Sequence, residues 1–150
     1  MSGERWIVVG CVLAGLAVVF GAFAAHGLDT RLPVQYAEQT RVVVGETVPA
    51  ARKYIADFKT AAEYQMFHAL GMIACGLVAI RRPAASLNVA GWCFLLGTVL
   101  FSGSLYALVL RGVTKLGMIT PFGGMLFIVG WVALAIGAAG SGRPTAGAAP

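Results

Sequence analysis

The sequence predicts an all-α fold: an integral membrane four-helix bundle with an extra amphipathic helix in the first loop. Two observations lead to this fold class. Of the 150 residues, 59% are hydrophobic and only 11% are charged, and the mean hydropathy is +0.83, whereas roughly a quarter of the residues of a soluble domain are charged. Four apolar stretches each approach the roughly 20 residues that cross a hydrocarbon core about 30 Å thick. We therefore expect one membrane domain, residues 1–139, and a disordered tail, residues 140–150.

The first span is expected at about 6–26, after Arg5. This apolar run is longer than the core of a secretory signal, about 7 to 15 residues, and no small-residue cleavage site follows it, so we interpret it as a retained span. The second span, about 60–80, is closed by Arg81, Arg82 and Pro83, a basic anchor followed by a helix stop. The third and fourth spans are expected at about 87–110 and 120–139.

The long connection between the first two spans, residues 29–59, is predicted to be partly helical. From Thr47, a plausible N-cap, apolar residues recur on one helical face, and charged residues fall elsewhere on the wheel. The apolar face holds Ala51, Ile55, Phe58 and Ala62, and the charged residues are Arg52, Lys53 and Asp57. Continued straight into the second span, this helix would be roughly 50 Å long, so its first turns must project from the bilayer or bend. Such a helix packs over the bundle mouth or serves as a lipid-sensing or partner-binding surface.

The net charge of +5 lies between the apolar stretches, as headgroup contacts and topogenic loops require, so we expect no nucleic-acid partner. Seven Lys and Arg residues fall on the side of the first and third loops and four on the other side, which favours both termini outside, but the first loop is also acidic and the orientation stays open. The three cysteines, Cys11, Cys75 and Cys93, lie inside spans without metal-ligand spacing. They predict inert thiols, with no cofactor and no metal.

Glycines indicate where helices approach closely. Gly123, Gly130 and Gly137 repeat every seven residues along the fourth span, which places a stripe of small residues on one face. Two further pairs of small residues, four positions apart, are also expected to allow close helix approach: Gly21 with Ala25 and Gly103 with Ala107. The partner of each face is another span of the same chain or a second copy, and the sequence leaves both open.

A few polar residues interrupt the apolar spans, and each must find a partner or line a wet cavity. The candidate polar cluster consists of His26, Glu63, Tyr64, Gln65, His68, Ser102, Ser104 and Tyr106. Tyr64 and His68 are four residues apart and so share a helix face. Three interpretations remain: a cluster that joins neighbouring spans, a proton relay or ligand site built on Glu63 and His68, or a metal or haem site built on His26 and His68.

The start of the fourth span is a candidate anion or lipid headgroup site, made of Lys115, Thr120, Gly123 and Gly124. Thr120 would cap the N–H of Gly123, and the positive helix end would hold a lipid phosphate or a carboxylate. The alternative is a capped helix whose neighbouring serines bond to carbonyls one turn back. The sequence does not favour a serine hydrolase, because it has no GxSxG elbow.

Four blocks of sequence carry a resemblance to a known family. They are Gly21 to Leu28, Tyr64 to Ala69, Phe101 to Tyr106, and Thr120 to Gly124 with Gly130 and Trp131. In this order they resemble the hallmark blocks of the small four-span family that includes bacterial YgdD and YwdK, known as domain of unknown function 423. The resemblance covers about residues 6–139 and implies an all-helical multi-pass membrane protein with no assigned activity, cofactor or site residue. The stretch from about Pro33 to Arg52 looks inserted relative to that family.

These observations predict a non-enzymatic protein of the cell membrane. The first hypothesis is a small scaffold or accessory subunit that binds itself, membrane lipids or a larger membrane complex. The second is a small transporter or channel with a polar path through the bundle, and the third is an enzyme that acts on lipid. A path requires the polar cluster to face a wet cavity, whereas a scaffold requires a dry cluster whose groups are paired.

Overall fold

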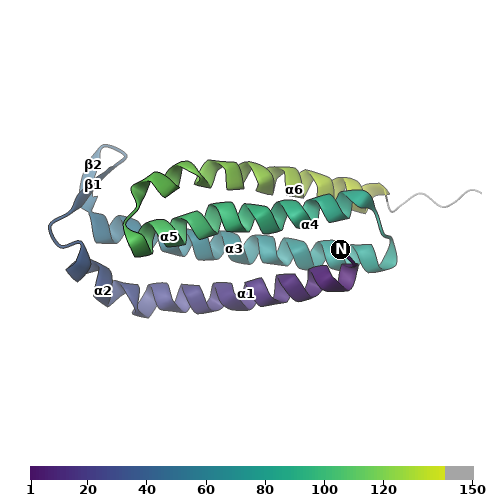
Figure 1. Cartoon of the computed structure of the whole chain (residues 1–150), viewed down its shortest axis with the longest axis horizontal. Coiled ribbons are helices and arrows are strands. Elements are labelled where there is room, and N and C mark those ends of the chain that lie inside the picture. Colours follow the sequence, from purple (N-terminus) through teal and green to yellow (C-terminus); the bar gives the residue numbers. More distant parts are fainter. Residues whose placement is uncertain (141–150) are drawn as a thin grey trace, which may run out of the picture.

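The computed structural model describes residues 1–140 and confirms an all-α membrane bundle (Figure 1). In chain order its elements are α1 (Gly3–His26), α2 (Leu28–Gln35), β1 (Thr40–Val43), β2 (Glu46–Pro49), α3 (Ala50–Arg81), α4 (Ala85–Thr98), the π-helix η1 (Val99–Gly103), α5 (Ser104–Arg111), the 3₁₀ helix η2 (Thr114–Met118) and α6 (Thr120–Gly140). Within these residues four segments are long and apolar enough to cross a membrane: Gly3–His26, Ala50–Arg81, Ala85–Arg111 and Thr114–Gly140. Gly140 ends α6 and is not part of a tail. The rest of the predicted tail lies outside the described residues.

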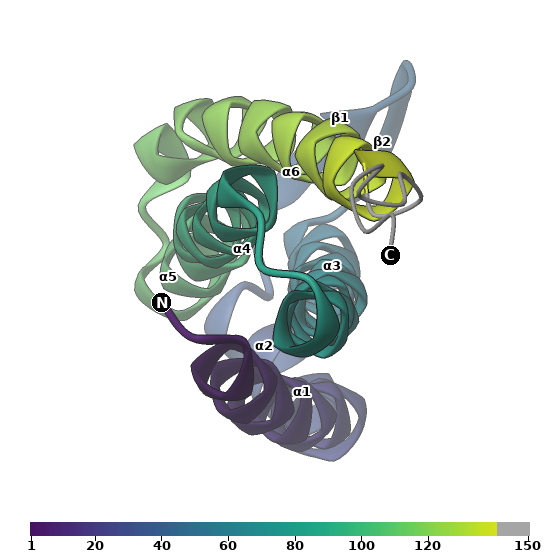
Figure 2. The same cartoon turned by 90° about the vertical axis from the view of Figure 1, so that its right-hand side faces the viewer.

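The spans are arranged in the order α1, α3, α4, α6, with α3 and α4 at the centre. Figure 2 shows α1 and α6 on opposite outer sides of this pair. α1 packs mainly against α3, and α6 mainly against α4. The outer spans are therefore the least covered. In the most apolar 18 residues of each span, 17% are buried in the first span and 28% in the fourth, against 39% in each central span.

The seven-residue glycine stripe of α6 forms the contact with α4 and η1 of the same chain. A Cβ on Gly130 would lie 2.6 Å from the ring of Phe94, and one on Gly123 would lie 2.5 Å from the backbone nitrogen of Phe101. Small residues are thus required for the close approach of these helices. By contrast, a Cβ on Gly21 or Gly103 would meet nothing within 4 Å, so the other two predicted pairs are not used in this way within the chain.

Helix α3 has 32 residues, or about 48 Å at 1.5 Å per residue, so about twelve of its residues extend beyond a hydrocarbon core about 30 Å thick. The predicted apolar face of this extension is confirmed: Ala51, Phe58 and Ala62 are buried, and Ile55 packs against the same core. α2 covers the extension with Leu28 and Leu32. A second apolar core, centred on Trp6, Met72 and Phe94, lies farther along the bundle.

The predicted helix start at Thr47 is wrong, because Thr47 lies in β2 and α3 begins at Ala50 without a side-chain cap. β1 and β2 form an antiparallel hairpin in which Val42 faces Thr47. β-branched residues favour strands, and Val44 and Gly45 turn the chain with positive φ angles of 51° and 83°, as a two-residue hairpin turn requires. The hairpin base is closed where the Ala50 N–H donates to the Gln39 carbonyl at 2.8 Å.

Candidate functional site

The eight residues of the predicted polar cluster do not form one site. His26 is exposed at the end of α1, and Glu63 is exposed on α3. Gly10 of α1 lies against Ala69 of α3, so His26, sixteen residues farther along α1, is about 24 Å from the level of His68. The structure therefore does not bring the two histidines together, as a metal or haem site built on both within one chain would require.

Gln65 is the centre of a hydrogen-bonded link between three helices. It is 3% exposed on α3. Its Nε2 donates to the carbonyl of Leu13 in α1 at 2.8 Å, and its Oε1 accepts from the hydroxyl of Tyr106 in α5 at 3.0 Å. Both ends of the amide are thus paired inside the bundle, which is what a dry interior requires.

A second polar link joins α5 to α6. The Ser104 hydroxyl donates to the carbonyl of Phe101 at 2.9 Å and lies 2.8 Å from the hydroxyl of Thr120. On α4, the Thr98 hydroxyl donates to the carbonyl of Phe94 at 2.8 Å. These bonds to preceding carbonyls are the alternative that the sequence offered for the serines.

Ser102 is the exception among the buried polar residues. It is 0% exposed, and its Oγ is the one fully buried side-chain oxygen or nitrogen of the described residues without a hydrogen-bond partner. It lies in the π-helix η1, where the regular helical ladder between α4 and α5 is interrupted. The middle of this span thus departs from regular α-helix beside the paired links.

His68 and Tyr64 belong to a cluster of aromatic side chains rather than to the Gln65 link. Nδ1 of His68 donates to the carbonyl of Tyr64 at 2.6 Å, because a carbonyl can only accept. The His68 ring stacks on Phe127 of α6, with ring centroids 3.3 Å apart and an angle of 5°. Tyr64 stacks on Phe101 at 4.6 Å and 19°. With Trp131, these rings line a cavity of about 470 Å³ between α3 and α6.

The four residues of the predicted anion site have different surroundings. Lys115 is exposed in η2. Thr120 pairs with Ser104, and Gly123 is packed against the backbone of Phe101. The N–H of Phe122, in the first turn of α6, donates to the Ile119 carbonyl at 3.1 Å. The helix start is thus largely occupied by the chain's own groups.

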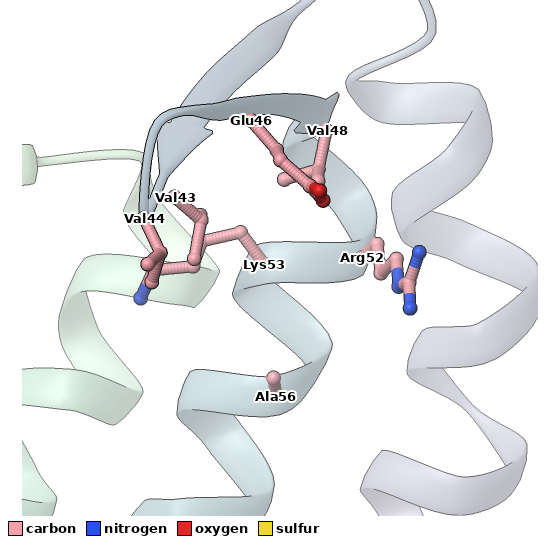
Figure 3. Close-up of a pocket in the computed structure, with 7 residues that line it drawn as sticks. All are labelled: Val43, Val44, Glu46, Val48, Arg52, Lys53 and Ala56. Carbon is pink, nitrogen blue, oxygen red and sulfur yellow. The ribbon is translucent and has the colours of Figure 1, made fainter.

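Outside the bundle, a hollow of about 440 Å³ lies between the hairpin and α3. Figure 3 shows Lys53 extending beneath Val43 and Val44 at the hairpin tip, whereas Arg52 points to the other side of α3. The Lys53 ammonium pairs with the carboxylate of Asp57 one turn along the helix. The hollow is lined by Val43, Val44, Glu46 and Val48 of the hairpin and by Arg52, Lys53 and Ala56 of α3.

A polar contact at the opposite end of the bundle was not predicted from the sequence. Oδ1 of Asn88 accepts from the Trp6 indole N–H at 2.9 Å and from the N-terminal ammonium at 2.8 Å. The Trp6 ring is fully buried and packs over Gly91. A lone asparagine in an apolar span was the available signal, because such a residue needs a partner.

The polar links in the bundle interior can hold helices together. The described residues contain no group of three His, Cys, Asp or Glu side chains placed to hold a metal ion.

The family model described as "Protein of unknown function (DUF423)" matches residues 20–124. A UPF0382 membrane protein of Staphylococcus saprophyticus is 39% identical over 132 residues, which cover 88% of this chain and 94% of that protein. UPF0382 membrane protein YwdK of Bacillus subtilis is 37% identical over 134 residues, 89% of this chain and 94% of its own. A Haemophilus influenzae relative is 39% identical over 135 residues, 89% and 93% of the two chains. No solved structure gives a significant match.

Proposed function

Because this chain belongs to the DUF423 family of membrane proteins, a family of unknown function, we propose that it is a non-enzymatic scaffold or accessory subunit that docks on membrane helices of a second copy or of a larger complex. The observation that carries this proposal is the pairing of Gln65, Ser104 and Tyr106 inside the bundle. A transporter needs a wet polar path, whereas paired groups stabilise a fixed contact between helices.

The outer face of α1 is the proposed docking surface. α1 is the least covered span, and both Gly15 and Gly21 leave open space where a side chain would stand. Small residues let the backbone of a neighbouring helix approach closely. Cys11 is exposed on this helix and provides a native reporter of such a neighbour.

The test is bismaleimide crosslinking through Cys11 in native membranes. A dimer band identifies self-association, and a larger adduct identifies a complex; Cys11→Ala removes either product. Gly21→Leu is expected to reduce the product several-fold because leucine fills the approach surface. The matched control is Gly103→Leu, since Gly103 also faces open space but lies in η1. Absence of any product, together with a monomeric mass in lipid nanodiscs, refutes the proposal.

Anionic lipids are the second expected partner. Exposed basic side chains surround the bundle end where α3 leaves the hydrocarbon core: Arg52, Lys59, Arg111 and Lys115. Such residues attract anionic headgroups with about 1 kcal/mol each near the surface. Lys115→Glu is expected to reduce co-purifying anionic lipid, measured by mass spectrometry, more than Arg31→Glu does on the outer surface of α2. Equal lipid content in both variants argues against a headgroup contact at Lys115.

A further inference from the structure

The aromatic cavity between α3 and α6 is lined by both buried and exposed rings. His68 and Phe127 are buried, at 4% and 3% exposed. Tyr64 and Trp131 are exposed, at 40% and 45%. Its volume of about 470 Å³ is within the range of small-molecule sites. A lining of aromatic side chains favours a flat aromatic ring as the occupant, because aromatic rings pair with one another through edge or offset contacts.

His68 places one polar atom in this apolar cavity. Its Nδ1 carries the proton that is donated to the Tyr64 carbonyl, so in the neutral ring Nε2 is left as an acceptor. Within the described chain nothing donates to Nε2. Nε2 is not fully buried, because Ser102 Oγ is the one fully buried side-chain atom without a partner in the described residues. Since His68 lines the cavity, a molecule in the cavity can reach Nε2. An acyl chain fills such a cavity but offers no donor.

We propose that this cavity binds a membrane-soluble quinol: a flat aromatic ring whose hydroxyl donates to His68 Nε2 and whose apolar tail leaves along α6. The site is independent of the docking surface on α1. The cavity extends along α6 from Pro121 to Trp131, ten residues or about 15 Å. Its long axis therefore runs along the bilayer normal, from the headgroup level inward, as an amphiphile with a ring and a tail requires.

Binding is measured by tryptophan fluorescence with the whole protein in nanodiscs. The probe is a short-tailed ubiquinol under anaerobic conditions, compared with its dimethyl ether, which keeps the ring but has no hydroxyl, and with cholesterol, which has a hydroxyl but no aromatic ring. We expect saturable binding of the quinol and binding of both other compounds that is about tenfold weaker, the equivalent of one lost hydrogen bond or stacking contact.

Two substitutions test the site in different ways. His68→Phe keeps a ring on Phe127 but removes the acceptor, so quinol affinity should fall about tenfold, to that of the ether. Gly124→Leu places a side chain in the cavity and leaves the His68 acceptor in the sequence. A Cβ at this position lies 3.9 Å from the Phe101 ring, in ordinary contact, so the helix backbone has room for it. This variant should abolish binding even if His68→Phe fails to fold. His26→Phe, on the other histidine, should bind as the wild type does.

Three results overturn the proposal. The first is equal affinity for the quinol and its ether, or an unchanged affinity in His68→Phe, because either result removes the hydrogen bond to Nε2. The second is equal affinity for cholesterol, because it removes the aromatic ring from the recognition. The third is a lack of saturable binding of every probe, or unchanged binding in Gly124→Leu, because the quinol then does not occupy this cavity.

Discussion

The link through Gln65 gives the most specific stability prediction. Gln65→Leu keeps the volume of the side chain but removes a donor to Leu13 in α1 and an acceptor for Tyr106 in α5. Hydrogen bonds between membrane helices contribute about 0.6 kcal/mol on average and up to about 1.7 kcal/mol. Two lost bonds therefore predict a decrease of about 1 to 3 kcal/mol in the free energy of unfolding.

The assay is equilibrium unfolding in mixed detergent micelles, run as a double-mutant cycle with Tyr106→Phe. The single variant Tyr106→Phe removes one of the two bonds, so it should cost about 0.6 to 1.7 kcal/mol. The double variant should cost less than the sum of the single variants, by about the energy of the shared bond. Gln35→Leu, on the exposed end of α2, is the control and should change stability by no more than about 0.5 kcal/mol.

Strict additivity of the two substitutions would contradict the bond between Gln65 and Tyr106, because residues that share no bond do not couple. A Gln65→Leu variant as stable as the control would do so too. Either result would mean that the amide of Gln65 finds water or another partner, and the interior of the bundle would then not be closed in the way described.

Three other predictions follow from the packing. Gly130→Leu should destabilise the bundle by about 1 to 3 kcal/mol by overpacking against Phe94, whereas Gly15→Leu should not; thermal unfolding measures both. Replacing residues 40–49 by two glycines should leave helix content and melting temperature nearly unchanged, because Gln39 and Ala50 already meet at the hairpin base; loss of the folded bundle would contradict this. Asn88→Leu leaves the Trp6 indole N–H without an acceptor and should cost about 1 to 3 kcal/mol, with a shift in tryptophan fluorescence; an unchanged spectrum would contradict the contact.

Properties that depend on the sequence of one helix alone, such as its span and the residues that share a face, were predictable. Hydropathy located the four spans, and the apolar face with Ala51 and Phe58 predicted that α3 extends beyond the membrane. The four-residue spacing of Tyr64 and His68 predicted a shared face, and their rings do lie 5.9 Å apart. The seven-residue glycine spacing predicted a close helix contact, which the structure assigns to α4 of the same chain.

Properties that depend on which helices meet were not predictable. Helix spacing does not say how deep a residue lies relative to another span, so His26 was grouped with His68. The hairpin was missed because the helical periodicity after Ala51 was extended back to Thr47, although the run of valines before Gly45 favours strands. The aromatic cavity was missed because Phe101, Phe127 and Trp131 are ordinary residues in an apolar span and gain meaning only where α3 meets α6.

Water access to position 102 shows whether the interior of the bundle is dry. Ser102→Cys is made in a background with alanine at the three native cysteines and treated in intact vesicles, from either side, with a membrane-impermeant methanethiosulfonate. In a dry bundle this fully buried position is not labelled, whereas a Lys115→Cys control is labelled completely. Labelling at position 102 at a rate comparable to the control would reveal a wet path and contradict the scaffold.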